Sequence, residues 1–261
     1  MKTALTIAGS DCSGGSGIQA DLKTFAAHRV YGMSIITSVV AENTVGVISL
    51  EDVSPKGIKN QFKAVFEDIF PNSVKIGMLS GRETIKACAE GLALYKPLNV
   101  VIDPVLYAKD KTPLTDEGCM ELLIKDVYSK ADILAPNIPE AERISGLKIN
   151  SLKDMEAAAE VICGLGVKAV LLKGGHFQGE PTDILFDGKA FHSFKGKRIN
   201  TKNTHGTGCT LSSAIASNLA LGFDILTSVS KAKKYINGSI ANALSLGNGC
   251  GPLNHNPDTW G

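Results

Sequence analysis

Short, almost unbroken apolar runs alternate along this chain with amphipathic segments of helical period. The apolar runs are typical of strands buried on both faces of a parallel sheet, and they predict strands at residues 4–8, 34–40, 74–76, 100–103, 133–135 and 169–172. The amphipathic segments predict helices at residues 17–27, 55–69, 82–95, 115–127, 139–145, 151–165, 208–221 and 225–246. Two short runs separated by Asp187-Gly188 predict a hairpin at 184–186 and 190–194. This order indicates an α/β fold with an open, mostly parallel sheet and helices on both faces.

The length and composition of the chain fit one domain. Its 261 residues are 44% hydrophobic and 20% charged, and the absence of a repeat or linker predicts a single domain over residues 1–261. The formal net charge of +1 indicates neither nucleic acid nor a membrane surface as a partner. The N-terminal apolar run is too short for a signal peptide, and no apolar stretch approaches the length of a membrane span. The six scattered cysteines, without a CxxC pair, favour reduced thiols, and we expect a cytoplasmic protein.

Polar or glycine-rich residues follow each predicted strand. In order along the chain these are Gly9-Ser10-Asp11, Glu42-Asn43-Thr44, Gly77-Met78, Asp103-Pro104-Val105, Asn137-Ile138-Pro139-Glu140 and Lys173-Gly174-Gly175. Ligands of open α/β sheets bind beyond the carboxyl ends of the strands. Because parallel strands bring these residues to one edge of the sheet, their coincidence predicts a binding site there.

One further segment leads directly into a predicted helix, and it reads Asn203-Thr204-His205-Gly206-Thr207-Gly208-Cys209. Glycines allow close approach of the backbone to a ligand, and the first N–H groups of a helix attract anions. The helix dipole at this position is expected to lower the pKa of a cysteine thiol. A plain glycine-rich turn with a buried, inert cysteine would give the same short pattern. The segment lacks the Gly-Lys-Ser/Thr ending of a P-loop.

Three charged positions follow the later strands. Asn137 and Glu140 are three residues apart at a helix start, and with Asp103 they could hold magnesium through oxygen ligands. The same spacing also fits a helix capping box, without any metal. Lys173 could bridge nucleotide phosphates, or it could be a solvated lysine in a turn.

His255 lies in a polar segment that we expect to be a mobile tail.

In order and spacing, the motifs resemble those of the bacterial hydroxymethylpyrimidine/phosphomethylpyrimidine kinases of the ribokinase superfamily, a branch that includes similar pyridoxine kinases. The resemblance covers nearly the whole chain. Its most specific stretches are Ser13-Gly14-Gly15-Ser16-Gly17 with the residues up to Phe25, then Lys75-Ile76-Gly77-Met78-Leu79, Asp103-Pro104-Val105 and residues 200–209. It implies a ribokinase-like, three-layer α/β/α fold with a mostly parallel central sheet and a small β hairpin or flap.

The resemblance also implies an activity: transfer of phosphate from ATP, with Mg²⁺, to the hydroxymethyl group of 4-amino-5-hydroxymethyl-2-methylpyrimidine and then to its monophosphate, in thiamine biosynthesis. Cys209 matches the position of the catalytic base, and Lys173 matches a lysine near the phosphates. The matches to the anion hole are Gly206, Thr207 and Gly208, and the matches to the magnesium-linked motif are Asn137 and Glu140, with Asp103 as a further metal candidate. The matches to the pyrimidine pocket are Ser16, Val40, Glu42, Met78 and Val105. A homodimer is compatible with the resemblance.

Glu42 departs from the pattern, since the thiamine-pathway kinases usually carry Gln there. This difference keeps open a pyridoxine or pyridoxal kinase of vitamin B6 salvage. A non-catalytic nucleotide or vitamin sensor with the same fold is a second alternative. The presence of Cys209, Lys173, Asn137 and Glu140 argues against the sensor, because a decayed enzyme should have lost some of them.

Overall fold

The structure, a computed structural model, describes residues 1–107, 113–175 and 180–256. In these residues nine strands form one sheet in the order β3-β2-β1-β4-β5-β6-β7-β8-β9. Their bounds are β1 Thr3–Asp11, β2 Tyr31–Glu42, β3 Val47–Asp52, β4 Ser73–Ile76, β5 Val100–Ile102, β6 Ile133–Leu134, β7 Ala169–Leu172, β8 Thr182–Phe186 and β9 Phe191–Lys195. The run from β2 to β7 is parallel, and β3, β8 and β9 are antiparallel additions at the two edges.

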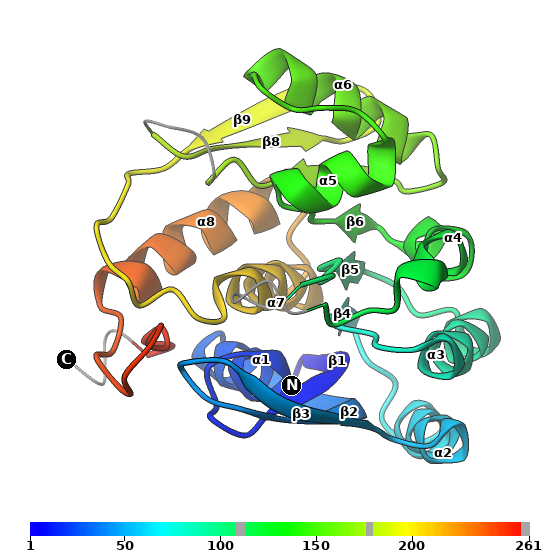
Figure 1. The fold of residues 1–261 in the computed structure, drawn as a ribbon. Helices are drawn as coiled ribbons and strands as arrows, with labels where there is room; N and C mark the ends of the chain where they lie inside the picture. Colours follow the sequence, from blue (N-terminus) through cyan, green and yellow to red (C-terminus); the bar gives the residue numbers. More distant parts are fainter. Residues whose placement is uncertain (108–112, 176–179, 257–261) are drawn as a thin grey trace.

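Helices cover both faces of the sheet, as Figure 1 shows. One layer contains α1 (Gly17–Ala27), α7 (Thr207–Ala220) and α8 (Ile225–Ala241), whose apolar residues share one core cluster. The other layer contains α2 (Pro55–Phe66), α3 (Arg82–Tyr95), α5 (Ile138–Ser145) and α6 (Leu152–Cys163), and these helices share the second cluster. The predicted three-layer α/β/α architecture with a mostly parallel sheet is therefore confirmed.

Helix α7 is the most deeply buried helix of the first layer. Every residue from Thr210 to Ala220 is buried, and the helix packs against β1, β4 and β5 in the middle of the sheet. Two of its polar side chains bond within the helix: Ser217 donates to the carbonyl of Ser213, and Asn218 donates to that of Ala214. This close packing places the first turn of α7 at the centre of the edge where the parallel strands end.

The structure differs from the predicted elements at three places. β3 was not predicted because it is an exposed edge strand with no apolar run. The helix predicted at 115–127 is instead an irregular segment, with a 3-10 turn at Glu117–Cys119, α4 at Met120–Leu122, a π-type turn at Leu123–Val127 and a second 3-10 turn at Tyr128–Lys130. α8 ends at Ala241, and the chain then returns toward β2, where Gly249 N–H bonds the hydroxyl of Thr44. The hairpin of β8 and β9 forms as predicted, and it extends the sheet through β7.

The expectation that His255 lies in a mobile tail is wrong. His255 is buried, its ring contacts the hydroxyl of Thr210 in α7 at 3.1 Å, and its carbonyl accepts a hydrogen bond of 2.8 Å from Tyr235 in α8. Burial lowers the pKa of His255 to about 4, so the ring is neutral at physiological pH. The polar groups of this segment are paired inside the protein, so its polar sequence does not indicate exposure to solvent.

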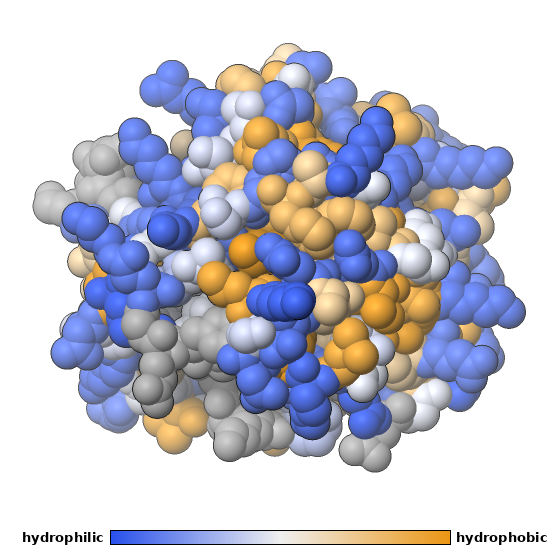
Figure 2. All heavy atoms as spheres, turned by 90° about the horizontal axis from the view of Figure 1, so that it is seen from above, coloured by the Kyte–Doolittle hydropathy of each residue, from blue (hydrophilic) through white to orange (hydrophobic). Residues whose placement is uncertain are grey.

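The outer surface of the sheet end formed by α6, β8 and β9 is mixed in character. Leu152 and Val161 of α6 are exposed, and Figure 2, viewed from this side, shows apolar residues interspersed with hydrophilic ones. Among residues 1–107, 113–175 and 180–256, no helix combines the length and apolar character that crossing a membrane requires.

Two glycines inside helices provide a matched test of this packing. A Cβ on Gly91 of α3 would lie 2.5 Å from the ring of the buried Phe62, whereas a Cβ on Gly238 of α8 would meet nothing within 4 Å. We expect Gly91→Ala to lower the free energy of unfolding by about 1–3 kcal/mol through overpacking. Gly238→Ala should raise it by up to about 1 kcal/mol, because alanine restricts the unfolded chain and favours helix.

Urea denaturation of the two variants and the wild type measures both changes. The double variant Gly91→Ala/Phe62→Leu, which shortens the opposing side chain, should lose less stability than the sum of the two single changes. Equal effects of alanine at the two glycines would contradict the packing described here.

Candidate functional site

A cavity of about 210 Å³ lies at the carboxyl ends of the parallel strands and at the first turn of α7. Of the predicted site residues, those that line it are Ser16, Val40, Glu42, Met78, Asp103, Val105, Asn137, Glu140, Lys173, Gly206, Gly208 and Cys209. Thr207 is the exception, since its hydroxyl turns back and donates to the carbonyl of Thr204 at 2.7 Å. The lining also includes Ser10 and His205, which lie in the predicted segments but were given no role of their own, and Tyr107 and Leu114, which the sequence did not single out. The predicted meeting of strand ends is therefore present.

The first turn of α7 is built for close approach. Gly206 has a left-handed φ of 79°, and a Cβ there would lie 1.9 Å from the carbonyl oxygen of Gly15. A Cβ on Gly208 would lie 2.8 Å from a carboxylate oxygen of Asp103. The first N–H groups of a helix have no partner within the helix, and they carry the positive end of the dipole. This turn can therefore bind an anionic group.

Cys209 lines the cavity in this first turn, but its pKa moves opposite to the prediction. Burial raises the pKa of the Cys209 thiol to about 11, and the charges of Asp21 and Asp103 contribute in the same direction. The charge of Lys75 and a hydrogen bond from the backbone of Gly17 lower the pKa by less than this. The expected lowering by the helix dipole is wrong in sign for the resting protein because desolvation of the thiolate outweighs it.

Asp103 and Lys173 form an ion pair at the ends of β5 and β7. The Nζ of Lys173 lies 2.7 Å from Oδ1 of Asp103, and their side chains are 15% and 2% exposed. The neighbouring charges of Asp103 and Glu140 help to keep the pKa of Lys173 above its ordinary value despite burial. The alternative of a solvated turn lysine is excluded by this geometry.

Asn137 and Glu140 form the capping box at the start of α5. The side chain of Asn137 accepts from the N–H of Glu140 at 3.0 Å, and the carboxylate of Glu140 accepts from the N–H of Asn137 at 2.8 Å. Burial raises the pKa of Glu140 to about 7, and Asp103 adds to this while Lys173 opposes it. The capping reading is thus correct, and the same two residues also line the cavity.

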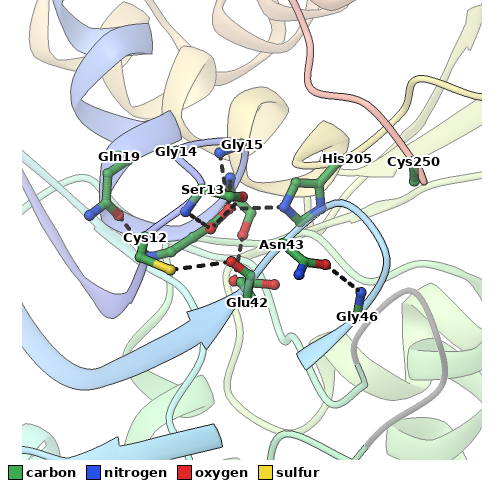
Figure 3. A network of polar contacts seen from close by, with 12 residues as sticks. Cys12, Ser13, Gly14, Gly15, Gln19, Glu42, Asn43, Gly46, His205 and Cys250 are labelled. Atoms are coloured by element: carbon green, nitrogen blue, oxygen red, sulfur yellow. Dashed lines mark hydrogen bonds and ion pairs between the residues drawn. The ribbon is translucent and has the colours of Figure 1, made fainter. Parts of the chain in front are cut away.

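Asp11 and His205 form a second ion pair, 194 residues apart in sequence, that joins the two glycine-rich loops. The Asp11 carboxylate accepts two bonds of 2.7 Å from Ser13, one from its N–H and one from its hydroxyl. It also accepts bonds from the N–H of Gly15 at 3.0 Å and the N–H of Ser16 at 2.7 Å. The Nε2 of His205 lies 2.9 Å from the same carboxylate. Figure 3 shows the His205 ring pointing toward the loop of Ser13, Gly14 and Gly15. No local pattern in the sequence signals this pair.

The hydrogen bonds and charges of this network set its ionisation. Burial would raise the pKa of Asp11, but the hydrogen bonds from His205, Ser13 and Ser16 hold it well below its usual range. Burial lowers the pKa of His205, yet Asp11, with a further contribution from Glu42, raises it above its ordinary value of 6.5. His205 therefore binds a proton more readily than an ordinary imidazole does.

Glu42 lies at the end of β2 on the wall of the cavity. Its Oε1 accepts a 3.3 Å bond from the hydroxyl of Ser16, and the turn that follows is capped instead by Asn43, which accepts from the N–H groups of Val45 and Gly46 (Figure 3). Ligand atoms of Asp11, Glu42 and His205 lie within 4.8 Å of one another. Since Asp11 already accepts five bonds, we assign the cluster to joining the loops rather than to a metal.

Comparison with known proteins places these features in a family. The family model described as phosphomethylpyrimidine kinase matches residues 11–254. The chain is 48% identical over 254 residues to the thiamine biosynthesis bifunctional protein ThiED of Geobacter sulfurreducens, covering 97% of this chain but only 52% of that relative. It is 46% identical over 261 residues to the hydroxymethylpyrimidine/phosphomethylpyrimidine kinase of Rhizobium meliloti, covering 98% of both chains.

Solved structures agree with this. A phosphomethylpyrimidine kinase of Clostridium difficile matches with a TM-score of 0.84 and 49% identity, over 92% of this chain and 100% of that one. A pyridoxal kinase of Staphylococcus aureus, in complex with AMP-PCP and pyridoxal, matches with a TM-score of 0.90 at 32% identity, over 100% of this chain and 95% of that one. The fold, the cavity and these matches together show that the chain belongs to the phosphomethylpyrimidine kinase family, within the ribokinase-like fold.

Proposed function

We propose that this protein phosphorylates the hydroxymethyl group of 4-amino-5-hydroxymethyl-2-methylpyrimidine and then its monophosphate, using ATP, in thiamine biosynthesis. The observation that carries the proposal is the position of Cys209 in the first turn of α7, inside a cavity that also includes Glu42 and Lys173. A general base, an anion-binding turn and a polar pocket for a heteroaromatic ring are thus combined in one small space. In this proposal the chain acts as one kinase domain in the cytoplasm.

In the proposed reaction the thiol of Cys209 loses its proton to solvent, and the resulting thiolate takes the proton of the substrate hydroxymethyl group. The substrate oxygen forms a bond to the γ-phosphorus of ATP while the bond from that phosphorus to the bridging oxygen breaks, and ADP leaves. Phosphoryl transfer depends on positioning and on stabilising the charge of the transferring group. The N–H groups at the start of α7, in the segment Gly206, Thr207 and Gly208, would stabilise that charge. Lys173, with Asn137, would contact the phosphates of the nucleotide.

Glu140 and Asp103 suit a magnesium ion. Both are buried, both line the cavity, and their carboxylates supply the oxygen ligands that Mg²⁺ prefers. The raised pKa of Glu140, which comes from burial and from Asp103, shows that a further positive charge beside this carboxylate would be favourable. A bound Mg²⁺ would supply neutralisation of the ATP phosphates at this end of the cavity.

The substrate ring would lie against Ser16, Val40, Glu42, Met78 and Val105, which combine apolar contacts with one carboxylate and one hydroxyl. A pyridoxine or pyridoxal kinase is the second candidate, favoured by the similarity to the Staphylococcus aureus pyridoxal kinase. The pyrimidine is the preferred substrate because the relatives at 46–48% identity bear names of the thiamine pathway, against 32% for the pyridoxal kinase.

A coupled assay of ADP release tests the function and the role of Cys209 together. The wild type with Mg²⁺ and ATP should turn over the pyrimidine and its monophosphate faster than pyridoxine. Cys209→Ala should cut kcat by ~10²–10⁴-fold, the usual contribution of a positioned base, while ATP binding persists because the anion-binding turn is backbone. Turnover of pyridoxine but not of the pyrimidine would contradict the proposed substrate. A near-normal rate in Cys209→Ala would show that Cys209 is not the general base.

Glu42 generates a prediction about pH. A carboxylate only accepts hydrogen bonds, so it cannot donate to the ring nitrogen beside the pyrimidine amino group. Pairing this carboxylate with that nitrogen therefore needs one extra proton, which a protonated ring would supply in a charge-assisted hydrogen bond. We expect the affinity for the pyrimidine to fall as pH rises above neutrality, because the protonated ring becomes scarce.

Calorimetric titration of the pyrimidine across pH, for wild type and Glu42→Gln, measures this dependence. The Gln amide can accept from the amino group and donate to the neutral nitrogen, so its curve should be flatter. Ser16→Ala is a matched control that removes the hydroxyl bonded to Glu42 and keeps the carboxylate, and it should retain the slope of the wild type. Parallel curves for wild type and Glu42→Gln would show that the ring brings no extra proton.

A further inference from the structure

A buried ion pair that the sequence did not indicate lies between β4, α1 and α7. Nζ of Lys75 is 2.8 Å from Oδ2 of Asp21, and both side chains are 0% exposed. Thr6 donates to the same carboxylate oxygen at 2.6 Å, and Ser213 donates to Oδ1 at 2.7 Å. Thr6 and Lys75 are paired across β1 and β4, so both point to the face of the sheet that α1 and α7 cover. The ammonium is therefore held within the protein by a carboxylate that is itself held by two hydroxyls.

This pair lies one helical turn below Cys209. In α1, Asp21 follows Gly17 by four residues, and in α7, Ser213 follows Cys209 by four residues. Gly17 hydrogen-bonds the thiol of Cys209 through its backbone, and Asp21 bonds Ser213. The two helices thus contact each other at two successive levels, separated by one turn of about 5.4 Å. The upper level carries the thiol at the cavity, and the lower level carries the ion pair.

Stability alone gives a weak reason for such a pair. Removing two charges from water is costly, and well-packed apolar residues of similar volume often stabilise a core as well or better. A cation close to a thiol has a different effect, because it favours the thiolate over the neutral thiol. Burial raises the pKa of Cys209 and so disfavours its thiolate, and the charge of Lys75 lowers the same pKa and opposes this effect.

We propose that Lys75 is a positioning residue of the reaction, a buried ammonium that stabilises the thiolate of Cys209 as it forms, and that Asp21, Thr6 and Ser213 hold this ammonium in place. The inference rests on the proposed role of Cys209 as the base. The thiol first loses its proton to solvent, and the thiolate then accepts the proton of the substrate hydroxymethyl group. The negative charge on the sulfur between these two events is balanced from below by Lys75.

Four charged groups act on the sulfur, each from a different element. Lys75 on β4 and Lys173 after β7 are cations, and Asp21 on α1 and Asp103 after β5 are anions. Lys75 and Asp21 therefore affect the thiol in opposite directions, because one favours the thiolate and the other opposes it. This opposition allows the charge effect to be separated from a purely structural one.

The test measures the rate at which iodoacetamide alkylates Cys209 as a function of pH, without ATP or substrate, in the full-length protein. The thiolate sulfur forms a bond to carbon and iodide leaves, so the rate reports the thiolate fraction. Mass spectrometry of the Cys209 peptide separates this site from the other cysteines. Asp21→Asn, which keeps the size of the side chain and one of its two acceptor oxygens but removes the charge, should shift the profile to lower pH. Lys75→Met/Asp21→Asn, which removes both charges together, should shift it to higher pH relative to Asp21→Asn and slow alkylation near neutral pH by about tenfold, which corresponds to one pKa unit.

Opposite effects of the cation and the anion would support the inference. Coincident pH profiles for Asp21→Asn and the double variant would overturn the inference. A shift of the Asp21→Asn profile to higher pH than the wild type would also overturn it. This second comparison decides the question even if the double variant does not fold. Kinase activity of the wild type on the pyrimidine, measured on the same preparation, tests the proposed function separately. If the wild type does not phosphorylate the pyrimidine but the two variants still shift the alkylation profile in opposite directions, the proposed function fails and the role of Lys75 stands. If the wild type is active but the opposite shifts are missing, the role of Lys75 fails and the proposed function stands.

Discussion

The contact between Gly206 and Gly15 is the constraint on which the rest of the site depends. The left-handed turn at Gly206 brings two glycine-rich loops so close that a single methyl group would overlap the carbonyl of Gly15. The Asp11–His205 ion pair joins the same loops beside this contact. Because α7 is buried in the middle of the sheet, the loop before it has little freedom to move away. The position of the anion-binding turn relative to the pocket is thus set by packing as well as by hydrogen bonds.

Burial has opposing consequences for the chemistry of this site. It excludes water from the reacting groups and strengthens electrostatic interactions, but it also disfavours ionised side chains, as the raised pKa values of Cys209 and Glu140 show. A cation acts on each of these two groups: the charge of Lys173 lowers the pKa of Glu140, and the charge of Lys75 lowers that of Cys209. Charged residues of both signs therefore lie together at this edge of the sheet, which is not uniformly basic.

Local patterns in the sequence predicted what depends on local physics. Apolar runs predicted the parallel strands, and the meeting of strand ends followed from their direction. The edge strand β3 has no such run, so periodicity does not indicate a strand there. The irregular segment at 117–130 has the apolar spacing of a regular helix, so periodicity predicts a helix that does not form. The pairs Asp11–His205 and Lys75–Asp21 join residues 194 and 54 positions apart, and no spacing rule connects them. The roles of Cys209 and Lys173 came from resemblance, whereas the sign of the thiol pKa required the depth of burial, which only the fold defines.

The return of the chain after α8 has a consequence for how the protein is made. The N–H of His205 bonds the carbonyl of Gly251, and residues 253–255 fill the space between α7 and α8. On the ribosome the sheet and most helices emerge well before these last residues, and domains fold as their segments become available. The loop that leads into α7 therefore gains its contacts with residues 251–255 late, after residue 255 has left the exit tunnel. A nascent chain that exposes the sheet and the helices but not yet residues 251–255 has the architecture without these contacts to the loop and to α7.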